Sequence, residues 1–439
     1  MLANSIAHVR TAKRMPYPTI LFPSGVPRNR EKESLQDYRR RGGYRALALA
    51  LGRGRPEAVV EEVAAAGLAG RGGARFPTAK KMAFCAEADG SEKYVVVNGG
   101  EDEPGSFKDQ ALLECVPHAV LEGVLLAAYA IGANKAFFYT NEHKTVALQR
   151  IGEALQQANA VGLLGSGILG TRFWLEVESR PAPTPYVAGE DTAVLEVLEG
   201  KKPIPRDKPP YPVTVGLFGK PTLVHNVETL ANLPPIILNG AAWFRGFGTP
   251  ESSGTMLFSM NDEWANPGVY ELPYGAPEGE LTEKLAGGLK NGAKLRAILP
   301  GGPSSAFVLP DRARPLSPEA LKVAGSNIGC GVMRGYAQGT CMVEATLEIA
   351  RFFERESCGK CPACRMETAT LANLLDKARQ GQIPRQALDQ IPRLLEFNKG
   401  KGACSLIGMP GPPILSAIRL FPEDFEAHFA AGACRAGKN

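Results

Sequence analysis

The sequence lacks an uninterrupted apolar run of the roughly 20 residues that a membrane-spanning helix needs. Its longest apolar stretch, residues 119–139, is broken by Glu122, Gly123 and Gly132. The N-terminus, MLANSIAHVRTAKRMPYP, has no apolar core of the kind that a secretory signal carries. The sequence therefore predicts a cytoplasmic protein that contacts a membrane only through partners.

A strong charge of either sign is also missing. Lys and Arg number 50 and Asp and Glu 45, which leaves a net charge of +5 on 439 residues. There is no basic stripe interleaved with aromatic residues, so we expect no nucleic-acid binding. Nine cysteines in a cytoplasmic chain are not expected to pair as disulfides.

The length and the pattern of apolar residues predict several domains, since one hydrophobic core does not extend over 439 residues. Apolar runs typical of strands alternate with helical stretches in the first half. Strands are expected at 94–98, 135–140 and 172–179, and helices at 56–68, 111–131, 144–158 and 226–233. Strands that alternate with helices favour an α/β fold with a mainly parallel sheet.

The second half changes character twice. Residues 255–311 combine short strands, glycines and one short helix at 278–285, which predicts a small β-rich domain. After residue 339 the pattern is helical, at 340–356, 366–379, 384–397 and 413–431. We therefore expect four parts: a loosely ordered, proline-broken N-terminal arm at 1–45, an α/β domain at 46–245, the β-rich domain at 250–330, and a helical domain at 338–439.

The most specific motif is ESCGKCPACR, in which Cys358, Cys361 and Cys364 form two overlapping CxxC spacings. A fourth cysteine, Cys404, follows in KGKGACS. Four thiolates of this kind hold iron–sulfur clusters, and bacterial ferredoxins use the same CxxCxxC run. The motif therefore predicts a four-iron 4Fe–4S cluster.

A closed zinc site is the alternative to a cluster, because four cysteines also bind zinc. Zinc sites more often pair two separate CxxC knuckles, so the single CxxCxxC run favours the cluster. The basic residues around the motif either offset the charge of the cluster or form a solvated face; they are Lys360, Arg365, Lys399 and Lys401. The other cysteines are interpreted as buried structural thiols; they are Cys85, Cys115, Cys330, Cys341 and Cys434.

Three polar loops are candidates for nucleotide binding. The first, GLAGRGGA at 67–74, lies before Lys80 and Lys81 and is either a phosphate cradle or a flexible loop. The second, GGEDEPGSFKD at 99–109, follows an expected strand, at the place where open α/β sheets bind ligands. The third, YVAGEDT at 186–192, precedes a helix, and both acidic loops also fit a solvated surface. The one GxGxxG match, at 165–170, precedes a strand and so is not a dinucleotide fingerprint.

Taken together, these segments resemble one family, the NADH-binding flavoprotein subunit of respiratory complex I and its relatives in NAD-linked formate dehydrogenases and hydrogenases. The resemblance runs from about residue 35 to 430. It is carried by GRGGARFPTAKKM, VVNGGEDEPGSFKD, YVAGEDTAVLEVLEG, KPPYPVTVGLFGKPTLVHNVETLAN and ESCGKCPACR with its distant Cys404. It implies an α/β domain for FMN and NADH, a ubiquitin-like β-grasp domain of the soluble-ligand-binding type, and a C-terminal helical bundle with the 4Fe–4S cluster.

The resemblance also implies roles for individual residues and for a partner. Glu103 and Glu190 are the candidate catalytic residues. FMN contacts are implied for Gly70, Gly72, Lys81, Asn98, Glu101, Tyr186, Gly189, Asn226 and Thr229, and NADH contacts for Phe76, Phe84, Lys208 and Tyr211. The implied reaction is hydride transfer from NADH to FMN and single-electron transfer to the cluster, inside a complex with a thioredoxin-like 2Fe–2S subunit.

The sequence departs from the family pattern at several of these positions. Arg75 replaces the second glycine of GAGFP, Gly99 and Gly100 replace Ala-Asp, and His225 replaces an asparagine. Asp191 stands where a glutamate is usual and Ala188 where a cysteine is common. Arg75 and Gly100 motivate an alternative interpretation, in which the chain is a non-catalytic iron–sulfur relay subunit that has lost NADH binding.

Overall fold

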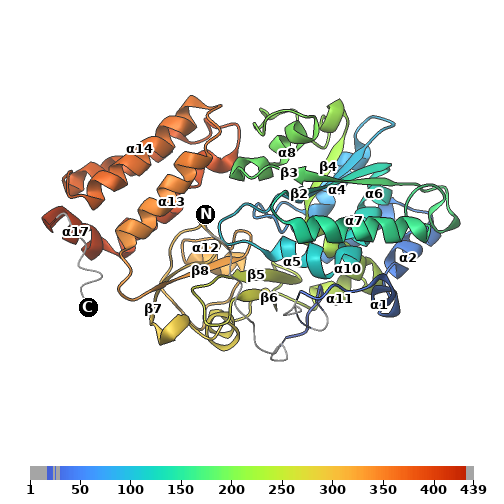
Figure 1. Cartoon of the computed structure of the whole chain (residues 1–439), viewed down its shortest axis with the longest axis horizontal. Helices are drawn as coiled ribbons and strands as arrows, with labels where there is room; N and C mark the ends of the chain where they lie inside the picture. Colours follow the sequence, from blue (N-terminus) through green and yellow to red (C-terminus); the bar gives the residue numbers. More distant parts are fainter. Residues whose placement is uncertain (1–16, 23–24, 26–29, 432–439) are drawn as a thin grey trace.

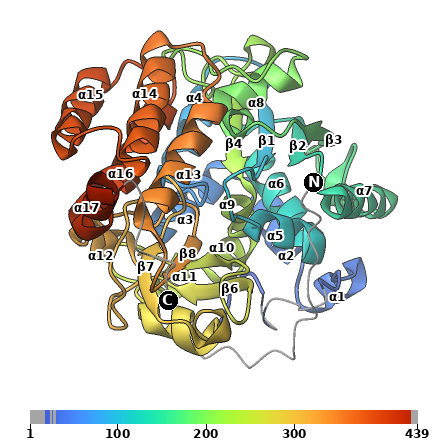
Figure 2. The ribbon, with the colours of Figure 1, turned by 60° about the vertical axis from the view of Figure 1, so that its left-hand side comes forward.

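A computed structural model of the chain describes residues 17–22, 25 and 30–431 (Figure 1). Two four-stranded sheets and a helical C-terminal segment make up this part of the chain. The C-terminal helices, orange and red in Figure 1, gather on one side of the molecule, next to the α/β part in blue and green, and Figure 2 shows them from another side. No single helix among the described residues is long and apolar enough to span a membrane, although α5 and α6 together pass that test as a pair bent by 98°.

The first sheet is parallel throughout, which confirms the predicted α/β class. Its strands are β1 (Tyr94–Gly99), β2 (Lys135–Asn141), β3 (Glu176–Ala182) and β4 (Thr222–Asn226), in the order β3-β2-β1-β4. Val95 and Val97 face one apolar core and Tyr94 and Val96 face another. Because both faces are covered, the central strands β1 and β2 are almost continuous apolar runs, whereas the edge strand β3 is mostly polar and only partly buried.

The larger core lies on the face that most helices cover. These are α1 (Leu35–Arg40), α2 (Arg45–Arg53), α3 (Glu57–Ala66), α4 (Thr78–Glu87), α5 (Lys108–Cys115), α6 (Pro117–Ile131), α7 (Thr145–Ala160), α9 (Val227–Ala231), α10 (Leu233–Asn239) and α11 (Ala241–Arg245). Helix α8 (Asp191–Leu198) packs on the other face. Helix α6 is buried along almost its whole length, and a Cβ at Gly123 would lie 2.0 Å from the carbonyl oxygen of Leu230, so only glycine lets α6 approach α9 this closely.

Several predicted elements need correction. The expected helix at 111–131 is two helices, because Pro117 lacks the N–H that a continuous helix needs and starts α6 instead. The strand expected at 172–179 begins and ends later, as β3, and the helix expected at 226–233 is α9 followed by α10, whose first turn contains Pro234.

The second sheet is mixed. It consists of β5 (Thr255–Met260), β6 (Gly268–Pro273), β7 (Leu295–Leu299) and β8 (Val332–Ala337), in the order β6-β5-β8-β7. The β5–β6 and β7–β8 pairs are antiparallel, and β5 and β8 are parallel. Its separate core centres on Trp264 and Phe258, joined by residues of α12 (Pro318–Val323) and of a π-helical turn at Glu280–Leu285.

The N-terminal segment is better ordered than the sequence predicts, where it is described. Ile20, Leu21 and Phe22 are buried, and their backbone N–H groups donate to the carboxylate of the buried Glu271 on β6, at 2.8 to 3.1 Å. Helix α1 also lies inside the predicted arm. The remainder of that arm, residues 1–16, 23–24 and 26–29, lies outside the described residues.

The C-terminal helices share one core. They are α13 (Met342–Glu356), α14 (Pro362–Arg379), α15 (Ile391–Asn398), α16 (Gly411–Leu420) and α17 (Pro422–Ala431). The helix expected at 413–431 is broken into α16 and α17, since Pro422 starts a new helix, and that expected at 384–397 is a 3-10 turn followed by α15. Helix α14 begins at Pro362, so Cys364 lies in its first turn and not in a loop before it. Cys434 lies outside the described residues.

Candidate cofactor sites

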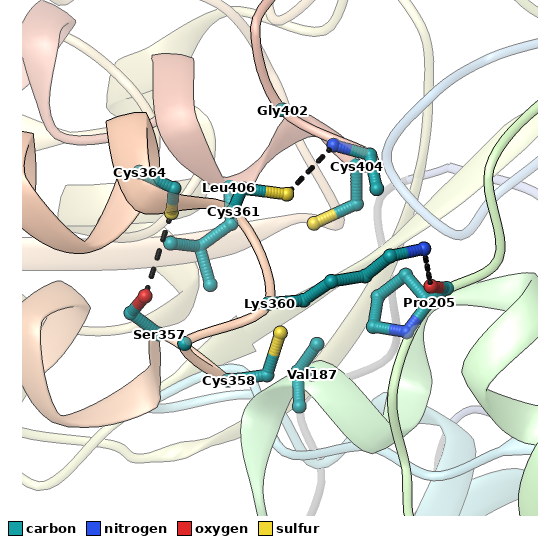
Figure 3. A pocket seen from close by; sticks show the side chains of 12 residues that line it. Val187, Pro205, Ser357, Cys358, Lys360, Cys361, Cys364, Gly402, Cys404 and Leu406 are labelled. Atoms are coloured by element: carbon teal, nitrogen blue, oxygen red, sulfur yellow. Dashed lines mark hydrogen bonds between the residues drawn. The ribbon is translucent and has the colours of Figure 1, made fainter.

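The four cysteines of the predicted cluster motif line one pocket (Figure 3). Cys358 and Cys361 come from the loop between α13 and α14, Cys364 from the start of α14, and Cys404 from the segment between α15 and α16. Val187 and Pro205 of the α/β part also line the pocket. The fold thus brings Cys404, which is distant in sequence, into the same pocket as the other three cysteines.

The surroundings of these thiols suit ligation. The N–H of Ala403 donates to Cys361 Sγ at 3.2 Å, and the Ser357 hydroxyl lies 3.5 Å from Cys364 Sγ. Hydrogen bonds to cluster sulfurs are one means by which proteins set a cluster potential. Burial raises the pKa of Cys404 to about 11, so its ligation must displace a proton.

The spacing of possible ligands separates a cluster from a single zinc ion. Four thiolates around one zinc, each at about 2.3 Å, must come within roughly 4 Å of one another. In the described part of the chain, no group of three or more His, Cys, Asp or Glu side chains converges in that way. In a cubane each thiolate binds a different iron, which needs a wider pocket. A CxxCxxC run that shares one pocket with a remote fourth cysteine is the ligand pattern of a 4Fe–4S cluster.

The basic residues near the motif have different environments. Lys360 Nζ donates to the carbonyl oxygen of Pro205 at 2.9 Å and pairs with Asp207, also at 2.9 Å. It therefore ties the cysteine loop to the α/β part. Lys399 pairs with the exposed Glu396, Lys401 lies over the ring of Phe397, and Arg365 is exposed. These three belong to a solvated face.

The glycine loop lies against the start of α9, at the carboxyl end of the parallel sheet. The backbone N–H of Arg71 donates to Thr229 Oγ1 at 2.9 Å. A Cβ at Gly72 would lie 3.2 Å from the Cβ of Asn226. Gly70 closes the loop by donating to the carbonyl oxygen of Phe76 at 2.9 Å. The structure thus brings together Gly70, Gly72, Asn226 and Thr229.

The third loop contributes a cluster of opposite charges. Lys208 Nζ donates to Glu190 and to Asp191, both at 2.7 Å, and Lys81 Nζ lies 3.6 Å from Asp191. Glu190 also caps α8 by accepting from the N–H groups of Thr192 and Ala193. Burial lowers the pKa of Lys81. The two lysines that the resemblance assigns to different nucleotides therefore share one carboxylate partner, Asp191.

Asn98 at the end of β1 joins the second and third loops. Its side-chain amide donates to the carbonyl oxygen of Gly189 at 2.8 Å. A Cβ at Gly189 would lie 3.0 Å from the carbonyl oxygen of Gly100, so the two loops touch backbone to backbone. A side chain at Gly100 would in turn meet the Tyr139 ring at 3.0 Å. The ring of Tyr139 therefore occupies the space into which a side chain at position 100 would extend.

The two glutamates of the acidic loop have different partners. The carboxylate of Glu101 accepts from the Ser106 hydroxyl and from the N–H groups of Asp109 and Gln110, so it holds its own loop. Glu103 Oε2 accepts from the Tyr186 hydroxyl at 2.7 Å, while its buried Oε1 has no protein partner. Burial raises the pKa of Glu103 to about 7.

The aromatic residues predicted for NADH are exposed. Phe76 is 46% exposed, Phe84 43% and Tyr211 57%. Among the described residues, none of the three contacts the ring of another. Their exposed faces are available for stacking, but the structure does not gather them into one cage.

Sequence reasoning missed a buried charged network beneath the glycine loop. Lys108 Nζ lies 2.7 Å from Asp109 and 2.9 Å from Glu228, and all three are almost fully buried. Asn226 Oδ1 accepts from Lys108 at 3.3 Å, and its amide donates to Asp109 at 2.5 Å. The only sequence signal was that two of the motif-bearing segments, SFKD and HNVETL, contain charged residues.

His225 next to this network was noted only as a departure from the family. It is buried on β4, and its Nε2 has no partner in the protein. Burial, followed by the charge of Lys81, lowers the pKa of His225 to about 3. The imidazole is therefore neutral at physiological pH.

Comparison with known proteins agrees with this architecture. Residues 63–235 match the Nuo51 FMN-binding domain, and residues 344–428 match the NADH-ubiquinone oxidoreductase-F iron–sulfur binding region. The first match covers the parallel sheet and its loops, and the second covers all four cysteines of the pocket.

Similar proteins match over more than 90% of this chain. The chain is 40% identical to the NADH-quinone oxidoreductase F 2 subunit of Rhizobium meliloti (strain 1021), over 95% of this chain and 99% of that protein. It is 37% identical to the HndC subunit of the NADP-reducing hydrogenase of Solidesulfovibrio fructosivorans, over 92% and 83%. Among solved structures, the NAD⁺-reducing NiFe hydrogenase in the H₂-reduced state matches with a TM-score of 0.80 and 34% identity, over 91% of this chain and 67% of that chain.

The fold and the two sites define a flavin- and iron–sulfur-binding subunit of an oxidoreductase. The chain belongs to the family of the F subunits of NADH-quinone oxidoreductase. It is an NADH dehydrogenase-type flavoprotein subunit with FMN, a 4Fe–4S cluster and NADH as its cofactors.

Proposed function

We propose that the glycine loop, the acidic loop and the third loop together form the site at which this chain binds FMN and oxidises NADH. The observation that carries the proposal is the convergence of Gly70, Gly72, Asn98, Gly189 and Asn226 at the carboxyl ends of β1 and β4. Ligands of open parallel sheets bind at that edge, and glycines let backbone N–H groups reach a phosphate.

Within this site, different groups of residues bind different parts of FMN and NADH. Gly70, Gly72 and Lys81 hold the phosphate and ribityl part of FMN, with Asn226 and Thr229 fixing the loop that carries them. Asn98, Glu101, Tyr186 and Gly189 shape the space for the flavin ring. Phe76, Phe84, Lys208 and Tyr211 bind NADH by stacking and by charge. The buried Lys108–Asp109–Glu228 network supports the loop from below.

Glu103 and Glu190 are the proposed catalytic carboxylates. When bound, FMN supplies the hydride acceptor and the 4Fe–4S cluster of Cys358, Cys361, Cys364 and Cys404 supplies the single-electron acceptor. Glu103, whose free Oε1 and pKa of about 7 let it exchange a proton near neutrality, orients the nicotinamide. Lys208 and the N–H groups at the start of α8 hold the carboxylate of Glu190 in one place within this site.

The finer domain assignment follows the same family. The β5–β6 hairpin, β8 parallel to β5, and the short helix α12 support a β-grasp domain of the soluble-ligand-binding type near 250–330. The helices α13–α17 and their shared core support a 4Fe–4S helical bundle at 338–439. An α/β domain at 46–245 completes the arrangement.

We place the chain in a multi-subunit oxidoreductase on the cytoplasmic side of the membrane. The relatives are named as subunits of NADH-quinone oxidoreductases and of a hydrogenase. The proposed neighbour in the complex is a thioredoxin-like 2Fe–2S subunit.

The test is an anaerobic absorbance spectrum of the purified full chain before and after NADH is added. Flavin bands that bleach with NADH, beside a broad iron–sulfur absorbance, are the expected result. An iron–sulfur spectrum without flavin, unchanged by NADH after reconstitution with FMN, would contradict the proposal and favour a non-catalytic relay. Arg75 does not favour that alternative, because its guanidinium is held by Tyr274 and Ser252.

A further inference from the structure

Arg75 directly follows the glycine loop and has a backbone conformation that L-residues rarely adopt. Its φ is 55°, in the left-handed region where glycine is the usual residue. This conformation strains a residue that carries a Cβ, so the surrounding structure has to hold it in place. The side-chain contacts of Arg75 are made with the second sheet domain and not with the loops of the flavin site.

The guanidinium of Arg75 binds two residues of that domain. Nη1 donates to the hydroxyl of Tyr274 at 2.7 Å, and Nη2 donates to Ser252 Oγ at 2.9 Å. The Ser252 hydroxyl in turn donates a hydrogen bond to Glu319 Oε1 at 2.6 Å. The guanidinium carbon also lies 4.9 Å from the centre of the buried Tyr274 ring, within the range of a cation–π contact.

A second arginine of the same loop meets the same ring. Arg71, which is almost fully buried, has its guanidinium carbon 4.8 Å from the Tyr274 centre and donates to the carbonyl oxygen of Ser253 at 3.1 Å. Its Nη1 also donates back to the carbonyl oxygen of Ala69 at 3.0 Å. The glycine loop is therefore attached to the segment 252–274 at two points, one on each side of Gly72 and Gly73.

We propose that Arg75 is a positioning residue that fastens the glycine loop to the second sheet domain, and that this attachment retains FMN and sets the orientation of Phe76. The inference rests on the proposed function, in which that loop holds FMN. Movement at Arg75 reaches the flavin side because Phe76 accepts from Gly70 and Ala69 pairs with Pro77, which makes the loop one closed unit. Arg75 does not itself contact nucleotide.

The backbone of Arg75 makes a clean variant available. Glycine adopts a φ of 55° without strain, so Arg75→Gly removes the side chain and leaves the loop conformation accessible. Tyr274→Phe removes one acceptor but keeps the buried ring. Asn291→Gly is the matched control, since Asn291 is exposed, has a φ of 58° and lies in a turn of the second domain.

The experiment measures FMN release from the full-length chain, by the recovery of flavin fluorescence after dilution, together with amide hydrogen exchange of residues 69–77. We expect Arg75→Gly to release FMN roughly tenfold faster and Tyr274→Phe roughly threefold faster, as contacting residues couple at this level. The double variant should release FMN no faster than Arg75→Gly alone. Asn291→Gly should behave as wild type, and iron content should be unchanged in all of them.

Two outcomes would overturn the inference. Wild-type release of FMN and wild-type exchange in both Arg75→Gly and Tyr274→Phe would show that the attachment does not position the loop. A rise in the NADH KM of Arg75→Gly that depends on salt, with FMN release unchanged, would make Arg75 a nucleotide ligand. A wild-type chain that binds no FMN after reconstitution would instead overturn the proposed function, which distinguishes the two failures.

Discussion

The hydroxyl of Tyr186 donates a 2.7 Å hydrogen bond to Oε2 of Glu103. The same tyrosine donates its backbone N–H to Glu356 at 2.8 Å, at the end of α13 and two residues before Cys358. Its neighbour Val187 lines the cysteine pocket. One short segment thus touches both the acidic loop of the proposed flavin site and the cysteine pocket.

Glu103→Gln should change how stability depends on pH. Burial raises the pKa of Glu103 from 4.5 to about 7, so between these values the folded chain holds a proton that the unfolded chain has lost. Wild-type stability therefore falls as pH rises from about 5 to about 8, by at most about 3 kcal/mol from this group. The variant lacks this contribution. Urea unfolding of the cofactor-free chain at both pH values measures it, and an equal pH dependence in variant and wild type would contradict the assignment.

His225→Asn should change the pH dependence of stability in the opposite direction to Glu103→Gln. Burial lowers the pKa of His225 from 6.5 to about 3, so the unfolded chain binds the extra proton and stability is lost as pH falls below 6.5. Between about pH 7 and about pH 4 the loss from this group is about 3 kcal/mol. The asparagine variant should therefore lose less stability than the wild type when the pH is lowered from neutral to acid. Thermal unfolding across this range tests the prediction, and parallel curves for the two proteins would refute it.

Cys361→Ser should abolish the cluster and leave the α/β part folded. A serine oxygen replaces a thiolate that Ala403 already supports by a hydrogen bond, and four cysteines are needed to complete the site. Iron content and the broad visible absorbance should fall to background, while FMN remains. The control is Cys85→Ala, which removes a buried thiol of α4 far from the motif. Cluster loss in the control, or a normal cluster in Cys361→Ser, would count against the ligand set.

Gly72→Asp should remove FMN and leave the cluster in place. A Cβ at this position lies only 3.2 Å from that of Asn226, and the added carboxylate would repel a bound phosphate. We expect FMN affinity to fall by at least about tenfold, measured by flavin fluorescence titration. Gly52→Asp is the matched control, because a Cβ there meets nothing within 4 Å. Retention of FMN with wild-type affinity in Gly72→Asp would exclude the glycine loop as the phosphate site.

Elements with a strong local signal were predicted well. The runs YVVVN and KAFFYT became β1 and β2, since their apolar residues are buried on both faces of the sheet. Helix boundaries next to proline were predicted poorly. Pro117 and Pro422 each start a new helix where the apolar pattern suggested one continuous helix. Periodicity indicates which residues are buried but not where a missing N–H redirects the chain.

What the sequence determined by itself is the chemistry that the chain carries. The spacing of Cys358, Cys361 and Cys364 and the glycine-rich and acidic loops depend only on residue type and short-range order. Only the tertiary structure decided which distant groups meet. It brought Cys404 to the other three cysteines, Tyr186 to Glu103, and Arg75 to Tyr274 and Ser252. Those contacts depend on how whole domains pack, a free-energy balance that involves many residues at once and leaves no local pattern in the sequence.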